Sequence, residues 1–439
     1  MSSPNRLMPD TFTQNDVASS RRFLLLQGLM GPFFHEIGKA FRKSGYAVYK
    51  INFNGGDQLF WRLPNGIDFT GSMDEWPKFL VDVLTRYGIT DVMLFGDCRP
   101  LHRKATELCI ERNIRVYVFE EGYIRPDWVT LELDGVNGHS SLPRNPEWYR
   151  QQACLLPPLP PHSQVPSSFR RRALEAVAYN TADLLTRWYF RNWHDYRPWH
   201  PWKEGVGWLK RLYRRDAAQV RTERILKEIE DNGLSYMLFP LQLDADAQIR
   251  LHSGFDGMEG AIRVVLGSFA RHAPKDLFLL VKEHPLDNGV KDWRKLVSIM
   301  AQQLDIGNRV RYLETGDIAQ LVRVAKGVVT INSTTGTLAL ICNVPVITLG
   351  QAIYDIPDIT DQGSLNHFWG SPTPPDPATF EAFRRVLIDR CLIEGGFFSR
   401  QGLALLVQGT LRRIRRTSPA QDGKVFTISH LDVPLPSSH

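Results

Sequence analysis

Short apolar segments that alternate with helical patterns constrain the fold of this chain more strongly than any other feature. They fall into two groups of predicted strands, at 23–26, 47–53, 91–95 and 116–119, and then at 236–239, 277–281, 310–312, 328–331 and 344–349. Strands that alternate with helices predict parallel sheets joined by right-handed crossovers. We therefore expect an α/β protein with two Rossmann-like lobes and a cleft between them.

Length and proline content set the expected domain limits. A chain of 439 residues is long enough for two domains, each with a substantial core. Prolines gather between Leu155 and Pro166, and the segment that follows is mostly helical. We predict a first lobe over residues 21–150, a connection with a helical insert over 151–230, and a second lobe over 231–416.

The composition is that of a soluble globular protein. Apolar residues make up 43% of the chain and charged residues 23%, and the net charge is +6. The five cysteines show no CxxC spacing, which argues against a disulfide framework or a zinc site and fits a reducing compartment. The first twenty residues lack the apolar region of a signal peptide, and no segment reaches the ~20 apolar residues of a membrane span. A cytoplasmic protein is expected.

Two adjacent carboxylates follow the predicted strand at 116–119. Glu120 and Glu121 stand at its C-terminal end, where ligands bind in open parallel sheets, and Gly122 permits a tight turn. Repulsion between neighbouring carboxylates tends to raise one pKa and to separate their roles. In the alternative, one Glu caps the backbone or pairs with Arg125 and the other is solvated. The residues alone leave both interpretations open.

Two polar segments occupy equivalent strand ends in the second half. Lys282-Glu283-His284-Pro285 follows the strand at 277–281, and Asn332-Ser333-Thr334-Thr335-Gly336 lies between the strand at 328–331 and a helix. A cation, an imidazole and a helix N-terminus with hydroxyl groups can together hold a phosphate. The alternatives are solvated charges in the first segment and ordinary helix capping in the second.

Polar, glycine-containing segments also end the other strands of the first lobe. The turn after the first strand has the position of a dinucleotide phosphate loop but lacks the GxGxxG spacing, so no dinucleotide site is expected. We predict that this edge forms the acceptor side of the cleft. The candidate acceptor residues are Gln27, Gly28, Asn54, Asp57, Asp97, Arg99 and Arg125.

The segment Arg187–Arg215 combines nine aromatic residues with eight Lys or Arg. Basic residues with interfacial aromatics are typical of a segment that lies on an anionic membrane surface. A stacking surface for single-stranded nucleic acid and a helical insert that packs on a lobe are the alternatives. The predicted membrane residues are Trp188, Arg191, Trp193, Arg197 and Trp199.

Several long motifs occur in the order found in one bacterial family. QGLMGPFF, INFNGGDQLFW, FGDCRPLH, FEEGYIRPDWVTLE, KEHP and INSTTGTLAL together resemble the capsular polysaccharide export proteins of the S type (KpsS), which are Kdo transferases of group 2 capsule assembly. The resemblance implies a GT-B-like fold in which the second lobe binds CMP-Kdo and the first binds a lysophosphatidylglycerol acceptor. It also implies that a related C-type Kdo transferase extends the product. Members of that related group carry Glu-Asp-Gly where this chain has Glu120-Glu121-Gly122.

Roles for single residues follow from the same resemblance. In a retaining reaction Glu121 attacks the anomeric carbon and Glu120 assists proton transfer. The implied donor-binding residues are Lys282, His284, Pro285, Ser333, Thr334 and Thr335. No metal and no nucleic acid are expected, and the enzyme is placed on the inner face of the cytoplasmic membrane among capsule assembly proteins. Two alternatives stay open: a sialyltransferase-like inverting enzyme, in which one Glu is only a general base, and a non-catalytic export adaptor.

Overall fold

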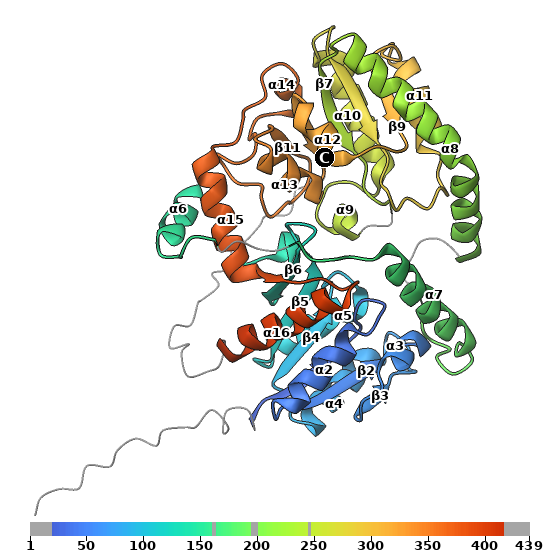
Figure 1. Cartoon of the computed structure of the whole chain (residues 1–439). Helices are drawn as coiled ribbons and strands as arrows, with labels where there is room; N and C mark the ends of the chain where they lie inside the picture. The colour runs from blue at the N-terminus through green and yellow to red at the C-terminus, as the bar shows by residue number, and fades with distance from the viewer. Residues whose placement is uncertain (1–19, 160–163, 195–200, 245–246, 417–439) are drawn as a thin grey trace, which may run out of the picture.

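Two α/β lobes lie one above the other in the computed structural model, and each has a central sheet with helices on its faces (Figure 1). The structure describes residues 20–159, 164–194, 201–244 and 247–416. The expected fold, two Rossmann-like lobes in a GT-B-like arrangement, is confirmed. Within the described ranges, no helix combines the length and the apolar composition that a membrane span requires.

The sheet of the first lobe has seven strands in the order β12-β6-β5-β4-β1-β2-β3. The strands are β1 (Arg22–Leu25), β2 (Ala47–Asn52), β3 (Gly66–Asp68), β4 (Asp91–Phe95), β5 (Arg115–Glu121), β6 (Trp128–Leu133) and β12 (Leu392–Glu394). The pairs from β3 to β5 are parallel, whereas β6 runs antiparallel to β5. Because Phe95 pairs with Phe119, β4 and β5 reach the same edge together. The helices that join these strands are α2 (Phe33–Lys43), α3 (Gly55–Phe60), α4 (Trp76–Arg86) and α5 (Pro100–Ile110).

The sheet of the second lobe has five parallel strands in the order β11-β10-β7-β8-β9. These are β7 (Tyr236–Pro240), β8 (Phe278–Lys282), β9 (Val310–Leu313), β10 (Gly327–Thr330) and β11 (Val346–Thr348). The helices between them are α9 (Ala247–Leu251), α10 (Met258–His272), α11 (Trp293–Gln303), α12 (Ile318–Val324) and α13 (Thr334–Ile341), with α14 (Leu365–Phe368) after β11. Strands β7, β8 and β10 are almost wholly buried, as expected for a sheet covered on both faces.

The C-terminal end of the chain returns to the first lobe, which differs from the predicted second lobe of 231–416. After α15 (Pro377–Cys391), β12 pairs with β6, and α16 (Arg400–Arg416) packs on the first lobe. Leu406 and Ile414 are buried in the same apolar cluster as Phe23 and Phe41. The sequence pattern identified the final helices but not their partner, because a helical apolar face does not specify the surface that it covers.

The predicted insert 151–230 is divided between the two lobes. Helix α7 (Phe169–Leu185) packs on α3 of the first lobe, and α8 (Pro201–Asp231) runs along the second lobe beside β9 (Figure 1). A Cβ on Gly56 would lie 2.5 Å from the ring of Tyr179, so the glycines that open α3 permit the close approach of α7. Helix α6 (Pro146–Cys154) packs against α15.

Candidate active site

A cavity of about 550 Å³ lies where the strand ends of the two lobes face each other. Its first-lobe wall comes from the segments after β1, β2 and β4 and from the end of β5, and its second-lobe wall comes from the segments after β7, β8 and β10. The predicted residues that line it are Gln27, Gly28, Asn54, Arg99, Glu120, Glu121, Arg125, His284, Ser333 and Thr334. The structure therefore brings the predicted carboxylates and three of the six predicted donor-binding residues, His284, Ser333 and Thr334, into one cleft.

Two guanidinium groups hold the Glu121 carboxylate. Arg125 Nη1 lies 2.8 Å from Glu121 Oε2, and Arg172 Nη2 of α7 lies 3.1 Å from Oε1. The Glu121 backbone N–H donates to Glu120 Oε1 at 3.0 Å. Glu121 thus pairs with Arg125, as the alternative interpretation expected, and it still lines the cleft. Both carboxylates line the cavity, and the two arginines fix the direction of one of them.

His284 faces the carboxylates from the second lobe as a neutral imidazole. The Leu286 backbone N–H donates to His284 Nδ1 at 3.0 Å, which leaves the ring proton on Nε2. Burial, together with the positive charges of Arg125 and Lys282, lowers the pKa of His284 to about 4. At neutral pH the side chain is therefore an Nε2–H hydrogen-bond donor rather than a cation.

The N-terminus of α13 forms the neighbouring part of the wall. Ser333 Oγ caps the helix by accepting from the Thr335 N–H at 3.2 Å, and the Tyr354 hydroxyl donates to the Ser333 carbonyl at 2.6 Å. Asn332 is held by Gln242, whose Nε2 donates to Asn332 Oδ1 at 2.8 Å. Helix capping and exposure to the cavity occur together here. The partial positive charge of the helix N-terminus is available to an anion in the cleft.

Several predicted residues lie behind the cavity wall. Lys282 Nζ donates to the Glu283 carbonyl at 2.8 Å, and burial lowers the pKa of its ammonium group to about 8. Asp57 accepts from the Phe53 N–H at 3.0 Å and supports the loop instead of lining the cleft. The other predicted residues that do not line the cavity are Pro285, Thr335 and Asp97.

Helix α7 supplies cavity residues that the sequence analysis missed. They are Arg172, Tyr179, Asn180 and Asp183. Their spacing places them on one face of a helix, and this periodicity was the available signal. Tyr179 is tied to the first lobe, because Gln27 Nε2 donates to its hydroxyl at 2.8 Å and the hydroxyl lies 3.2 Å from Asp57 Oδ1.

The predicted membrane residues divide into three groups. Trp188 is 71% exposed and Arg191 is also exposed. Trp193 is instead half-buried, with its ring centroid 6.1 Å from that of Phe53, and it lines the cavity, so its assignment to a membrane surface is corrected. Arg197 and Trp199 lie outside the described residues.

The depressed pKa of His284 predicts a specific pH dependence of stability. An unfolded histidine binds a proton near pH 6.5, whereas folded His284 does so at about pH 4. Between these values the unfolded state holds more protons, so stability falls as the pH falls. When the pH falls from 7 to 5, the unfolding free energy of the wild type should decrease by about 1–2 kcal/mol more than that of His284→Gln, which lacks the imidazole. Urea unfolding at both pH values checks this.

A matched control is His272→Gln, because His272 is exposed on α10. This variant is expected to follow the wild-type pH dependence. Equal losses in the wild type and in His284→Gln would contradict the neutral state of the imidazole.

Comparison with known proteins shows the family of the chain. A family model described as capsule polysaccharide biosynthesis protein matches residues 90–398. The chain belongs to this family. Capsule polysaccharide export protein KpsS of Escherichia coli is 35% identical over 386 residues, which cover 87% of this chain and 97% of that protein.

Two further proteins, one matched by sequence and one by structure, extend the comparison. Capsule polysaccharide modification protein LipB of Neisseria meningitidis serogroup A is 35% identical over 403 residues, which cover 88% of this chain and 94% of that protein. The solved structure of KpsC from Thermosulfurimonas dismutans, a β-Kdo 2,7 transferase, matches with a TM-score of 0.42 and 14% identity over 90% of this chain and 100% of that chain. The resemblance to the S-type capsule proteins is thereby confirmed.

Proposed function

We propose that this capsule biosynthesis protein is a glycosyltransferase that moves Kdo from CMP-Kdo to a lysophosphatidylglycerol-type lipid, and so starts the β-Kdo linker of a capsular polysaccharide. One observation carries the proposal. The cleft places the Glu120 and Glu121 carboxylates on one wall and uncharged hydrogen-bond donors, His284, Ser333 and Thr334, on the other. These are the groups needed to attack an activated sugar and to release its nucleotide.

The second lobe provides donors for the CMP phosphate. His284 Nε2–H, the Ser333 and Thr334 side chains and the N-terminus of α13 all face the cleft. Such preformed donors stabilise charge as it develops on a leaving phosphate. The carboxylate of Kdo is a second anion, and the guanidinium groups of Arg125 and Arg172 are the cations nearest to Glu121. Their charge favours an acidic sugar over a neutral one.

The first lobe provides the nucleophile and the base. In the retaining reaction a Glu121 oxygen bonds to the anomeric carbon while the bond from that carbon to the CMP phosphate breaks. An acceptor hydroxyl then attacks the same carbon, its proton passes to Glu120, and the Glu121 carboxylate is released. We expect hydrogen bonds from the second-lobe donors to stabilise the leaving phosphate, so that transfer proceeds without a divalent metal.

A second groove fits the lipid part of the acceptor. It has a volume of about 1200 Å³ and lies between α8 and the loop after β8. Apolar and basic side chains line it together, among them Trp208, Leu209, Leu212, Arg214 and Arg215. In the loop after β8, His284 and Leu286 face the cleft, whereas the neighbouring Pro285 and Asp287 face the groove. An acyl chain in the groove would therefore bring its headgroup beside the cleft.

Incubation with CMP-Kdo and a lysophosphatidylglycerol tests the proposal. We expect CMP release that depends on the acceptor and a product heavier by one Kdo residue, measured by chromatography and mass spectrometry, with and without a chelator. CMP-sialic acid and a neutral lysolipid serve as matched controls for donor and acceptor. Absence of product from CMP-Kdo under both conditions would rule the proposal out.

A further inference from the structure

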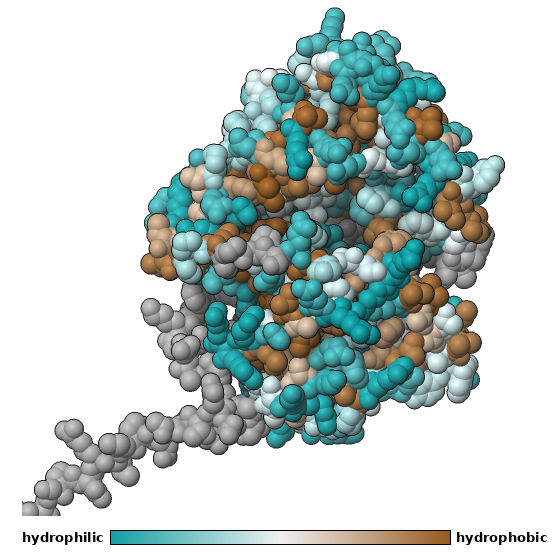
Figure 2. Space-filling model, viewed as in Figure 1, coloured by the Kyte–Doolittle hydropathy of each residue, from teal (hydrophilic) through white to brown (hydrophobic). Residues whose placement is uncertain are grey.

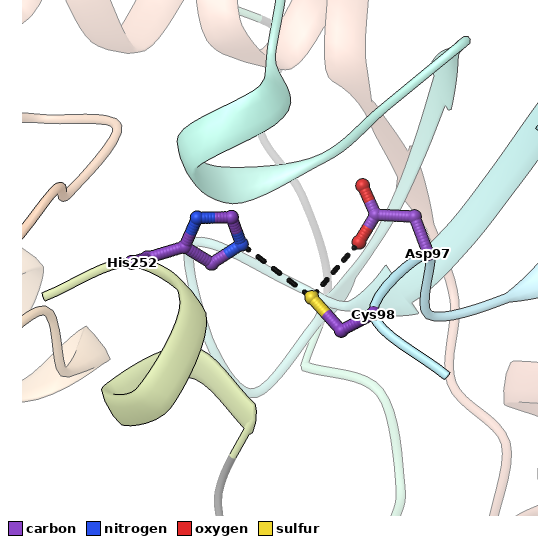
Figure 3. A group of neighbouring side chains, drawn as sticks. All are labelled: Asp97, Cys98 and His252. Atoms are coloured by element: carbon purple, nitrogen blue, oxygen red, sulfur yellow. Dashed lines mark hydrogen bonds between the residues drawn. The ribbon is translucent and has the colours of Figure 1, made fainter. Parts of the chain in front are cut away.

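Three metal-binding side chains from opposite lobes meet beside the cleft. Asp97 and Cys98 follow β4 in the first lobe, and His252 follows α9 in the second; the His252 ring and the Asp97 carboxylate are both directed at the Cys98 sulfur, which lies between them (Figure 3). One ligand atom from each lies within 4.8 Å of the others. Within the part of the chain that the structure describes, no other group of three or more His, Cys, Asp or Glu residues meets this criterion.

The separations of these atoms fit a tetrahedral metal centre. Cys98 Sγ lies 3.2 Å from Asp97 Oδ1 and 3.4 Å from His252 Nε2. With Zn–S of about 2.3 Å and Zn–N of about 2.1 Å, a tetrahedral zinc ion holds sulfur and nitrogen about 3.6 Å apart. A shift of a few tenths of an ångström would therefore admit the ion. The sulfur is already close to the distance from the carboxylate and from the imidazole that coordination requires, and all three ligand atoms lie within 4.8 Å of one another.

Charge and surroundings also suit a divalent cation. A Cys98 thiolate and the Asp97 carboxylate would balance both charges of the ion, and a neutral His252 would complete a sulfur, oxygen and nitrogen ligand set that zinc accepts. Asp97 is 3% and His252 is 1% exposed, so little water competes for the ligands. Asp97 Oδ2 is oriented by the Val136 N–H and by His139 Nδ1, each at 3.0 Å, which leaves Oδ1 for the metal.

We propose that Asp97, Cys98 and His252 form a Zn²⁺ site that links the two lobes at the edge of the cleft. Binding replaces the thiol proton of Cys98 with the metal and releases that proton to solvent. A fourth coordination position stays open, and Cys98 also lines the cleft. The cysteine spacing does not reveal this site, because Cys98 and His252 lie 154 positions apart and belong to different lobes. The site is separate from the transfer chemistry proposed above.

Co²⁺ is the probe, since a cysteine thiolate bound to Co²⁺ gives a ligand-to-metal charge-transfer band in the near ultraviolet. We expect one equivalent of Co²⁺ to produce the band in the full-length protein and Zn²⁺ to abolish it. Cys98→Ser should remove the band, and Cys154→Ser, which changes an exposed cysteine, should keep it. His139→Gln should keep the band but weaken binding by about 10–100-fold, because it removes only an orienting contact.

Alkylation gives a second measurement that does not depend on a variant. Zn²⁺ should slow the labelling of Cys98 by N-ethylmaleimide by at least about tenfold, because only the metal-free fraction of the thiol reacts. The labelling of Cys154 should not change. Peptide mass spectrometry measures both rates. Thermal unfolding without metal should be the same for Cys98→Ser and the wild type. No band in the wild type, an unchanged band in Cys98→Ser, or equal protection of both cysteines would overturn the site and leave the cluster as a hydrogen-bonded contact.

Discussion

Glu121→Gln is expected to lower kcat for Kdo transfer by about three orders of magnitude or more, because an amide cannot form the glycosyl-enzyme. The amide keeps the size of the carboxylate but loses the charge that Arg125 and Arg172 hold at 2.8 and 3.1 Å. CMP affinity should change little, since the phosphate donors belong to the second lobe. Steady-state kinetics together with calorimetric CMP titration would separate the two effects.

Matched variants decide what Glu121 does. Glu147→Gln, which changes an exposed residue of α6, should leave kcat unaltered. Glu120→Gln should slow the step that takes the acceptor proton, so a Kdo adduct on Glu121 should accumulate and be visible by mass spectrometry. An adduct supports retention, whereas an active enzyme that never forms one supports the inverting alternative. Full activity of Glu121→Gln in capsule production would instead favour an export adaptor.

The parts of the site that could be predicted from sequence are those set by local pattern. The predicted strand 91–95 coincides with β4, and 116–119 lies within β5, so the carboxyl ends of these strands and their polar residues were placed correctly. Strand β5 extends through Glu121 because β6 pairs with it, and β6 was not predicted. Its partner strand β12 comes from the far end of the chain, and no local pattern indicates such a pairing.

Contacts between distant elements account for the other differences. Lys282 was expected beside His284 in the cleft, but its ammonium group donates to the Glu283 carbonyl instead. The alternation of side chains along a strand does not specify this contact. Arg172 reaches Glu121 from a helix that begins 48 residues after the carboxylate, counted from Glu121 to Phe169. Helical periodicity shows that Arg172, Tyr179 and Asp183 share a face, yet it does not show that this face closes the cleft.

The exposed surface of α7 and α8 bears on how the protein meets a lipid acceptor. Apolar side chains gather over α7 and the adjoining end of α8, at the right of the view (Figure 2). Those more than 60% exposed are Phe169, Leu174, Val177, Leu184, Leu185, Trp188, Leu209, Leu212 and Tyr213. Phe169 lines the groove together with Leu209 and Leu212, which joins the two helices into one surface. Exposed cations lie among them, at Arg170, Arg187, Arg191, Lys210, Arg214 and Arg215.

This combination favours peripheral attachment to an anionic membrane, which we propose as the working location of the protein. Cations near an anionic leaflet contribute about 1 kcal/mol each, and exposed aromatic and aliphatic side chains add burial at the headgroup level. Arg211 is left out of the test variant, since it donates to the Asp287 and His284 carbonyls and therefore supports the fold.

The triple variant Arg170→Glu, Arg187→Glu, Arg191→Glu is expected to bind phosphatidylglycerol vesicles at least about 100-fold more weakly than the wild type, because three contributions of about 1 kcal/mol are lost. Sedimentation in low salt measures the binding, and raising the salt should release the wild type as well. The matched control reverses three exposed charges of the second lobe, Lys275, Arg323 and Lys326, and should bind normally. Activity of the triple variant on a short-chain, soluble acceptor should persist. Normal sedimentation of the triple variant, or loss of that activity, would show that the surface is structural.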